Sequence, residues 1–135
     1  MKYSFYYSLK VWLFSVFLAP LIYIIAESIY NPGAFISEPA IEIYILTVLF
    51  ELAFSFITWL IFWMIIVIAI KYLSNKIIIK WLIFILGIIL TVLTFISLSS
   101  GENPFSFHDI YWGIMLYNCL CIGIGTWLFG LSRQA

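Results

Sequence analysis

The sequence predicts an all-α fold: a polytopic membrane protein whose four helices form an antiparallel transmembrane bundle, with both termini in the cytoplasm. Three observations lead to this class. Hydrophobic residues make up 66% of the 135 residues and charged residues only 9%, whereas soluble domains carry roughly a quarter charged residues. The apolar residues form continuous runs rather than the alternating pattern of barrel strands. Basic and acidic residues also fall toward opposite ends of the runs.

These runs predict one transmembrane domain over residues 1–135 with four spans, at about 11–29, 41–70, 78–98 and 110–131. The first span follows an aromatic and basic segment, residues 1–10, which suits the headgroup region of a bilayer. We expect Pro20 to kink this span. Its length, and the absence of a small-residue cleavage site after it, argue against a signal peptide. Asn31-Pro32-Gly33 then predicts a turn.

The second run, 41–70, is too long for a simple crossing. As a helix it measures about 45 Å, while the hydrocarbon layer is about 30 Å thick, and tilt alone would have to reach roughly 48°, beyond the usual range of about 0–40°. Counting about 20 residues back from Lys71 places the outer boundary near Glu51. Residues 38–50 are therefore predicted to form an outer extension, either straight or bent along the surface. Ser37 is its expected N-cap, followed by Glu38 and Pro39.

The two remaining spans are separated from their neighbours by recognisable connections. Residues 71–80 predict a short basic turn with Ser74-Asn75 at its apex. Before the fourth span, Ser106 and Asp109 have the spacing of a capping box. Cys119 and Cys121 lie two residues apart in that span, so their side chains point to nearly opposite faces and are not expected to bind a metal together.

Charge determines the predicted orientation. All basic residues fall at the N-terminus, between the second and third spans, or at the C-terminus: Lys2, Lys10, Lys71, Lys76, Lys80 and Arg133. All acids fall toward the other side: Glu27, Glu38, Glu42, Glu51, Glu102 and Asp109. Short loops rich in lysine and arginine stay in the cytoplasm. We therefore expect a multi-pass protein of the inner (plasma) membrane with an outer acidic face of Glu38, Glu42, Glu102 and Asp109.

Each span carries small or weakly polar residues at helical spacing, which favour helix association in lipid because they allow close backbone approach and hydrogen bonding. The stripes are Ser8, Ser15, Ala19 and Ala26; Glu51, Ser55 and Thr58; Gly87, Thr91 and Thr94; and Cys119, Gly123, Thr126 and Gly130. They are interpreted as the inside of the bundle. The alternative is that one stripe, that of the fourth span, serves self-association or a partner. Asn118 is expected to form a helix–helix hydrogen bond.

Glu51 is the strongest functional candidate, because an ionisable residue in a span marks a functional site by default. With Ser55 and Thr58 it forms a polar face that suits a proton or cation path. The alternative is a solvated carboxylate at the outer interface, which the length of the second run favours. Glu102, His108 and Asp109 are interpreted as a capped, solvated turn rather than a metal site, and no cofactor is expected. Motifs of phosphate loops, nucleophile elbows and zinc enzymes are absent from the sequence.

These observations predict a non-enzymatic integral membrane binding or accessory protein: a subunit of a membrane complex, or an immunity protein against a membrane-acting toxin. Its expected partners are the lipid bilayer and either another protein or a second copy of itself within the membrane, and not nucleic acid. The alternative is a small homo-oligomeric ion or solute transporter or channel that uses the Glu51 face.

Overall fold

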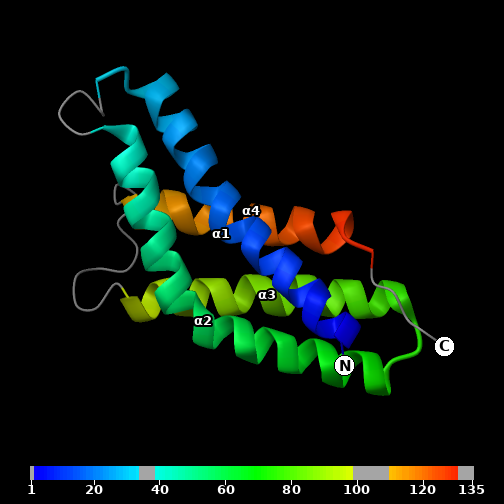
Figure 1. Ribbon diagram of the computed structural model, residues 1–135. Coiled ribbons are helices and arrows are strands. Elements are labelled where there is room, and N and C mark those ends of the chain that lie inside the picture. Colours follow the sequence, from blue (N-terminus) through cyan, green and yellow to red (C-terminus); the bar gives the residue numbers. More distant parts are fainter. Residues whose placement is uncertain (1, 34–38, 99–109, 131–135) are drawn as a thin grey trace.

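Four α-helices make up the regular structure of the computed structural model (Figure 1): α1 (Lys2–Tyr30), α2 (Ala40–Tyr72), α3 (Lys76–Leu98) and α4 (Ile110–Leu128). The structure describes residues 2–33, 39–98 and 110–130, and these ranges contain no strand. The all-α prediction is therefore confirmed for this part of the chain. Helices α1, α2 and α3 are long and apolar enough to cross a membrane, and α4 contributes a shorter apolar helix, Trp112–Leu128.

Helix α1 is longer than the predicted first span because it begins at Lys2 rather than near residue 11. The segment before Pro20 contains no glycine or proline to interrupt a helix, and its side chains Ser4, Tyr7 and Ser8 are buried. The helix continues through Pro20, which is also buried. It ends at the predicted turn, where the backbone N–H of Asn31 donates to the Glu27 carbonyl at 2.8 Å.

The start of α2 differs from the prediction. Its N-cap residue is Pro39, with φ −65° and ψ 124°, and not Ser37; this extended backbone means that the helix begins at Ala40. The next connection is also shorter than the predicted turn over 71–80, because only residues 73–75 leave the helix. The Asn75 side chain caps α3 by accepting the Ile77 N–H at 2.9 Å. The lysines on both sides are compatible with helix, so they do not mark its ends.

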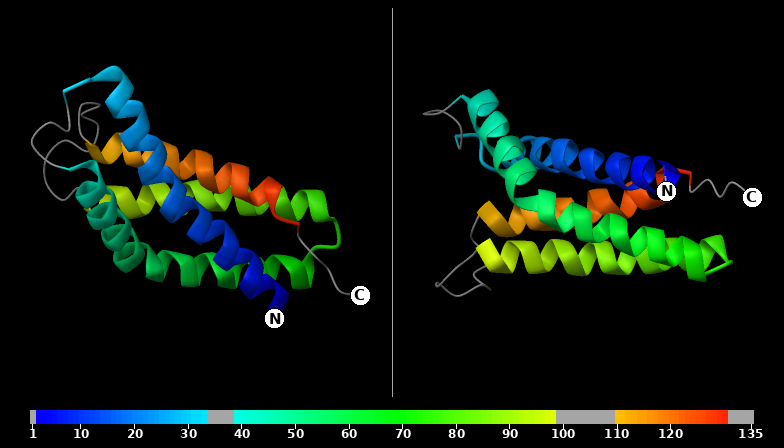
Figure 2. Two further views of the ribbon diagram at one scale, coloured as in Figure 1. Left: turned by 45° about the horizontal axis from the view of Figure 1, so that its top comes forward. Right: turned by 60° about the horizontal axis from the view of Figure 1, so that its bottom comes forward.

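The four helices form a closed ring in which α1 and α3 each pack against both α2 and α4 (Figure 2). Near one end, the Tyr7 hydroxyl on α1 donates to the Thr126 carbonyl on α4 at 2.9 Å. The α2–α3 connection lies at this same end of the ring (Figure 1). We call it the lysine end, after Lys71, Lys76 and Lys80, and we call the opposite end, with Glu27 and Glu42, the carboxylate end.

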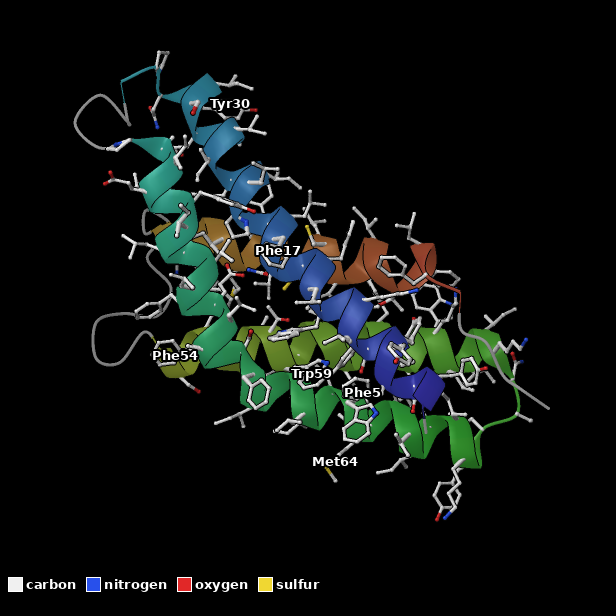
Figure 3. All side chains as sticks on the ribbon, viewed as in Figure 1. Phe5, Phe17, Tyr30, Phe54, Trp59 and Met64 are labelled. Carbon is white, nitrogen blue, oxygen red and sulfur yellow. The ribbon has the colours of Figure 1, made fainter. Side chains whose placement is uncertain are left out.

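The hydrophobic core lies toward the lysine end. It consists of buried residues from three helices: Tyr7, Val11, Phe62, Ile66, Ala69, Ile79 and Ile83. Partly buried residues of α4, Ile122 and Phe129, pack against it. Many large apolar side chains are exposed instead, and Met64 among them points outward (Figure 3). An exterior of this kind is not typical of a water-soluble monomer, but it carries no penalty in lipid.

Helix α2 is bent, and the bend lies near Phe54 (Figures 1 and 3). The helix contains no proline or glycine, and the bend lies next to the polar contacts of Ser55. The Ser55 hydroxyl donates to the Glu51 carbonyl and accepts the Trp12 indole N–H from α1 at 2.9 Å. Serine bonding of this type bends helices. The bend thus lies a few residues beyond the predicted outer extension, residues 38–50.

Candidate functional site

A cavity of about 340 Å³ lies inside the helix ring, between the middle of α1 and α2 and the carboxylate-end halves of α3 and α4. All four helices contribute to its wall, which is mostly apolar and aromatic. The lining residues include Trp12, Ser15, Leu46, Thr47, Phe50, Glu51, Phe54, Ser55, Thr58, Trp59, Phe62, Gly87, Thr91, Thr94, Phe95 and Asn118. Glu51 is the one ionisable side chain among the described residues that line it.

Glu51 is half-buried, and its carboxyl group is turned toward α4. One of its oxygens, Oε1, accepts a hydrogen bond from Asn118 Nδ2 at 3.0 Å. Asn118 is 5% exposed, and its Oδ1 accepts the hydroxyl of Ser15 at 2.6 Å. The expected helix–helix hydrogen bond of Asn118 is therefore confirmed, and it forms part of a polar chain that joins α2, α4 and α1.

The predicted polar face of α2 contacts three different helices. Glu51 reaches α4 through Asn118, and Ser55 reaches α1 through Trp12. The Thr58 hydroxyl lies 2.9 Å from the Thr94 hydroxyl on α3. The structure thus places Glu51, Ser55 and Thr58 in one cavity wall, but it divides them among separate interhelical bonds.

Two tryptophans that were not among the predicted site residues, Trp12 and Trp59, form one side of the cavity. The Trp12 and Trp59 rings are stacked, with centroids 5.2 Å apart. Trp59 is buried, and its Nε1 has no hydrogen-bond partner among the described residues. Helical spacing was the available signal, because Trp12 and Ser15 lie three residues apart while Ser55 and Trp59 lie four apart, so each pair shares a face.

The small-residue stripe of α4 packs mainly within the chain. Gly123 is buried against α3, since a Cβ atom at this position would lie 2.8 Å from a ring carbon of Phe84. Thr126 is fully buried, and Cys119 is half-buried. Gly130 is exposed, and a Cβ atom there would meet nothing within 4 Å.

Of the four residues predicted to form an outer acidic face, the structure describes one. Glu42 lies in the first turn of α2 and is exposed. Glu38, Glu102 and Asp109 lie outside the described residues, as do His108 and the predicted capping box from Ser106 to Asp109. Within the described ranges, no three histidine, cysteine or acidic side chains form a cluster suited to a metal ion.

Comparison of the chain with protein-family models, with curated proteins and with solved structures found no match.

Proposed function

We propose that this protein is a non-enzymatic binding protein of the inner membrane that holds a small lipid-soluble ligand in the cavity at Glu51. The observation that carries the proposal is the cavity itself, which combines a mostly apolar wall with convergent polar groups of Glu51, Ser15 and Asn118. Sites for small molecules have this composition.

The proposal includes four crossings of the bilayer with both termini in the cytoplasm. Its support is the separation of described charges, with Lys71, Lys76 and Lys80 at one end and Glu27 and Glu42 at the other, together with the positive-inside rule. In this orientation the cavity is nearer the outer leaflet. A reporter fused after Ala135 should be active in the cytoplasm; activity outside the cytoplasm would overturn the orientation.

Ligand binding can be tested by native mass spectrometry of the full chain released from its own membranes in mild detergent. The variant Thr91→Phe places a large ring in the cavity wall, because Thr91 lines the cavity and is 7% exposed. Leu93→Phe is the matched control on the same helix, since Leu93 is 54% exposed. We expect a bound small molecule in the wild type and in Leu93→Phe, and its loss in Thr91→Phe. Equal occupancy in all three proteins, or none in the wild type, would contradict the proposal.

The same purification tests the narrower roles of accessory subunit and immunity protein. If a foreign protein co-purifies in a one-to-one ratio, that protein would be the bound partner, and the binding site would be an interface between the two proteins.

A second candidate function is transport of an ion or solute, with self-association of the chain. It is favoured by one observation, that Glu51 faces a cavity shared by all four helices. Flux into liposomes that depends on Glu51, together with a stable homo-oligomer, would support transport over simple binding.

A further inference from the structure

We propose that the cavity selects an amphipathic monocation: a lipid-soluble molecule with an aromatic or aliphatic body and a single ammonium group, bound with this group against the Glu51 carboxyl. The inference rests on the proposed function, because it names the ligand class of the same cavity. Three properties of the cavity support the inference: the charge of the residues that line it, its aromatic wall and its volume.

The one ionisable group among the described residues that line the cavity is an acid. Glu51 contributes a carboxyl group, and none of the described lysines lines the cavity; Lys71, Lys76 and Lys80 lie at the lysine end. The contact that the structure gives this carboxyl is the neutral amide of Asn118. A carboxylate in mostly apolar surroundings is stabilised by a cationic partner, and an ammonium group on a ligand supplies one.

The wall beside Glu51 favours the same ligand. The stacked rings of Trp12 and Trp59 line it together with Phe54, Phe62 and Phe95. Aromatic faces attract cations through their electron-rich surface, and they also accommodate an apolar body. A carboxylate ligand would be repelled by Glu51, and a sugar-like ligand would leave hydroxyl groups unpaired against apolar side chains.

The volume limits the ligand to a small molecule. The cavity, about 340 Å³, lies at the lower end of the range of about 300–1,000 Å³ that is typical of small-molecule sites. This volume suits one ring with a short alkyl chain better than a lipid with two acyl chains.

The test uses three probes with the same body and different head groups: phenylbutylammonium, phenylbutanol and phenylbutyrate. Binding to the full chain in nanodiscs of zwitterionic lipid is measured by isothermal titration calorimetry, with empty nanodiscs as the blank. We expect the ammonium probe to bind at least about tenfold more tightly than the alcohol, because the ammonium group adds a charge–charge attraction to the Glu51 carboxylate that a neutral hydroxyl group lacks. Phenylbutyrate should bind most weakly.

The variant Glu51→Gln keeps the shape of the side chain and an acceptor for Asn118 but removes its charge. It should lose the preference for the ammonium probe over the alcohol, while Glu42→Gln, an exposed acid on the same helix, should keep it. Circular dichroism and gel filtration check that both variants fold. The comparison of the three probes on the wild-type protein does not depend on either variant.

The outcomes separate this inference from the proposed function. Equal binding of all three probes, abolished by Thr91→Phe, would overturn the ligand class and leave the binding cavity standing. A preference for the ammonium probe that survives Glu51→Gln would also overturn it. Failure of all three probes to bind would also overturn the amphipathic monocation as the ligand class. The proposed function would then be tested by whether Thr91→Phe removes the molecule that co-purifies with the wild type.

Discussion

The two ends of the helix ring are built from the same four helices, yet they differ in packing. Toward the lysine end, Ile66, Ile79 and Ile83 fill the interior and are almost completely buried. Toward the carboxylate end, the helices surround a cavity, and their interior contacts include the polar Ser15–Asn118–Glu51 chain. Lipid provides no hydrophobic force to bring helices together, so close packing and interhelical hydrogen bonds hold such a ring.

Under the proposed function, the two halves have different roles. The filled half supplies stability, and the hollow half binds the ligand. If this is correct, substitutions in the filled half should lower the free energy of unfolding strongly, whereas substitutions of cavity residues should change it little.

The largest effect is expected in the core of the lysine end. Ile83 is fully buried on α3, so Ile83→Ala should lower the free energy of unfolding by about 2–4 kcal/mol, because it leaves a void among packed side chains. Ile85→Ala is the matched control, since Ile85 is 51% exposed two residues away and should change the value by less than about 0.5 kcal/mol. Both can be measured by unfolding in mixed micelles. Equal losses would mean that the core is packed no better than the lipid-facing surface.

An intermediate effect is expected at the α3–α4 contact. Gly123→Val should cost about 1–3 kcal/mol of unfolding free energy, because its side chain would collide with Phe84. Gly130→Val should stay within about 0.5 kcal/mol, because the space around Gly130 is open. Unfolding in mixed micelles measures both. If Gly123→Val instead left the monomer stable and dissociated an oligomer, the α4 stripe would act between chains.

The smallest effect is expected at the cavity wall. Thr58→Val removes the hydroxyl that contacts Thr94 on α3, and interhelical hydrogen bonds in membranes average about 0.6 kcal/mol. Thr47→Val is the control, because the Thr47 hydroxyl bonds the Ile43 carbonyl within its own helix. The difference in unfolding free energy between the variants should therefore be about 0.6 kcal/mol. A loss above about 2 kcal/mol for Thr58→Val would place a main source of stability at the cavity and remove the contrast.

The sequence predicts the helices well because continuous apolar runs and strong breakers are local signals. Asn31-Pro32-Gly33 and Ser74-Asn75 both fall where helices end. The exact boundaries were harder to predict. The lysines suggest a turn over 71–80, but a helix accepts lysine, so α2 and α3 extend through Lys71 and Lys76.

The site was predictable only in its separate parts. Glu51 and Asn118 each stand out as polar residues in apolar runs, but their bond depends on which faces of α2 and α4 meet, and periodicity within one helix does not contain that information. The bend of α2 has the same origin, because the indole that bonds Ser55 comes from α1. For Trp12 and Trp59, amphipathic spacing places them on the right faces without indicating that they stack.

The bend gives the first part of α2 mechanical leverage. From Ala40 to Phe54 this segment is an arm about 22 Å long, and Leu46, Thr47 and Phe50 on it form part of the cavity wall. A rotation of about 10° at Ser55 would displace the tip of such an arm by about 4 Å, and the cavity wall at Leu46, nine residues from the bend, by about 2 Å. A small change of the bend angle would therefore change the width of the hollow half.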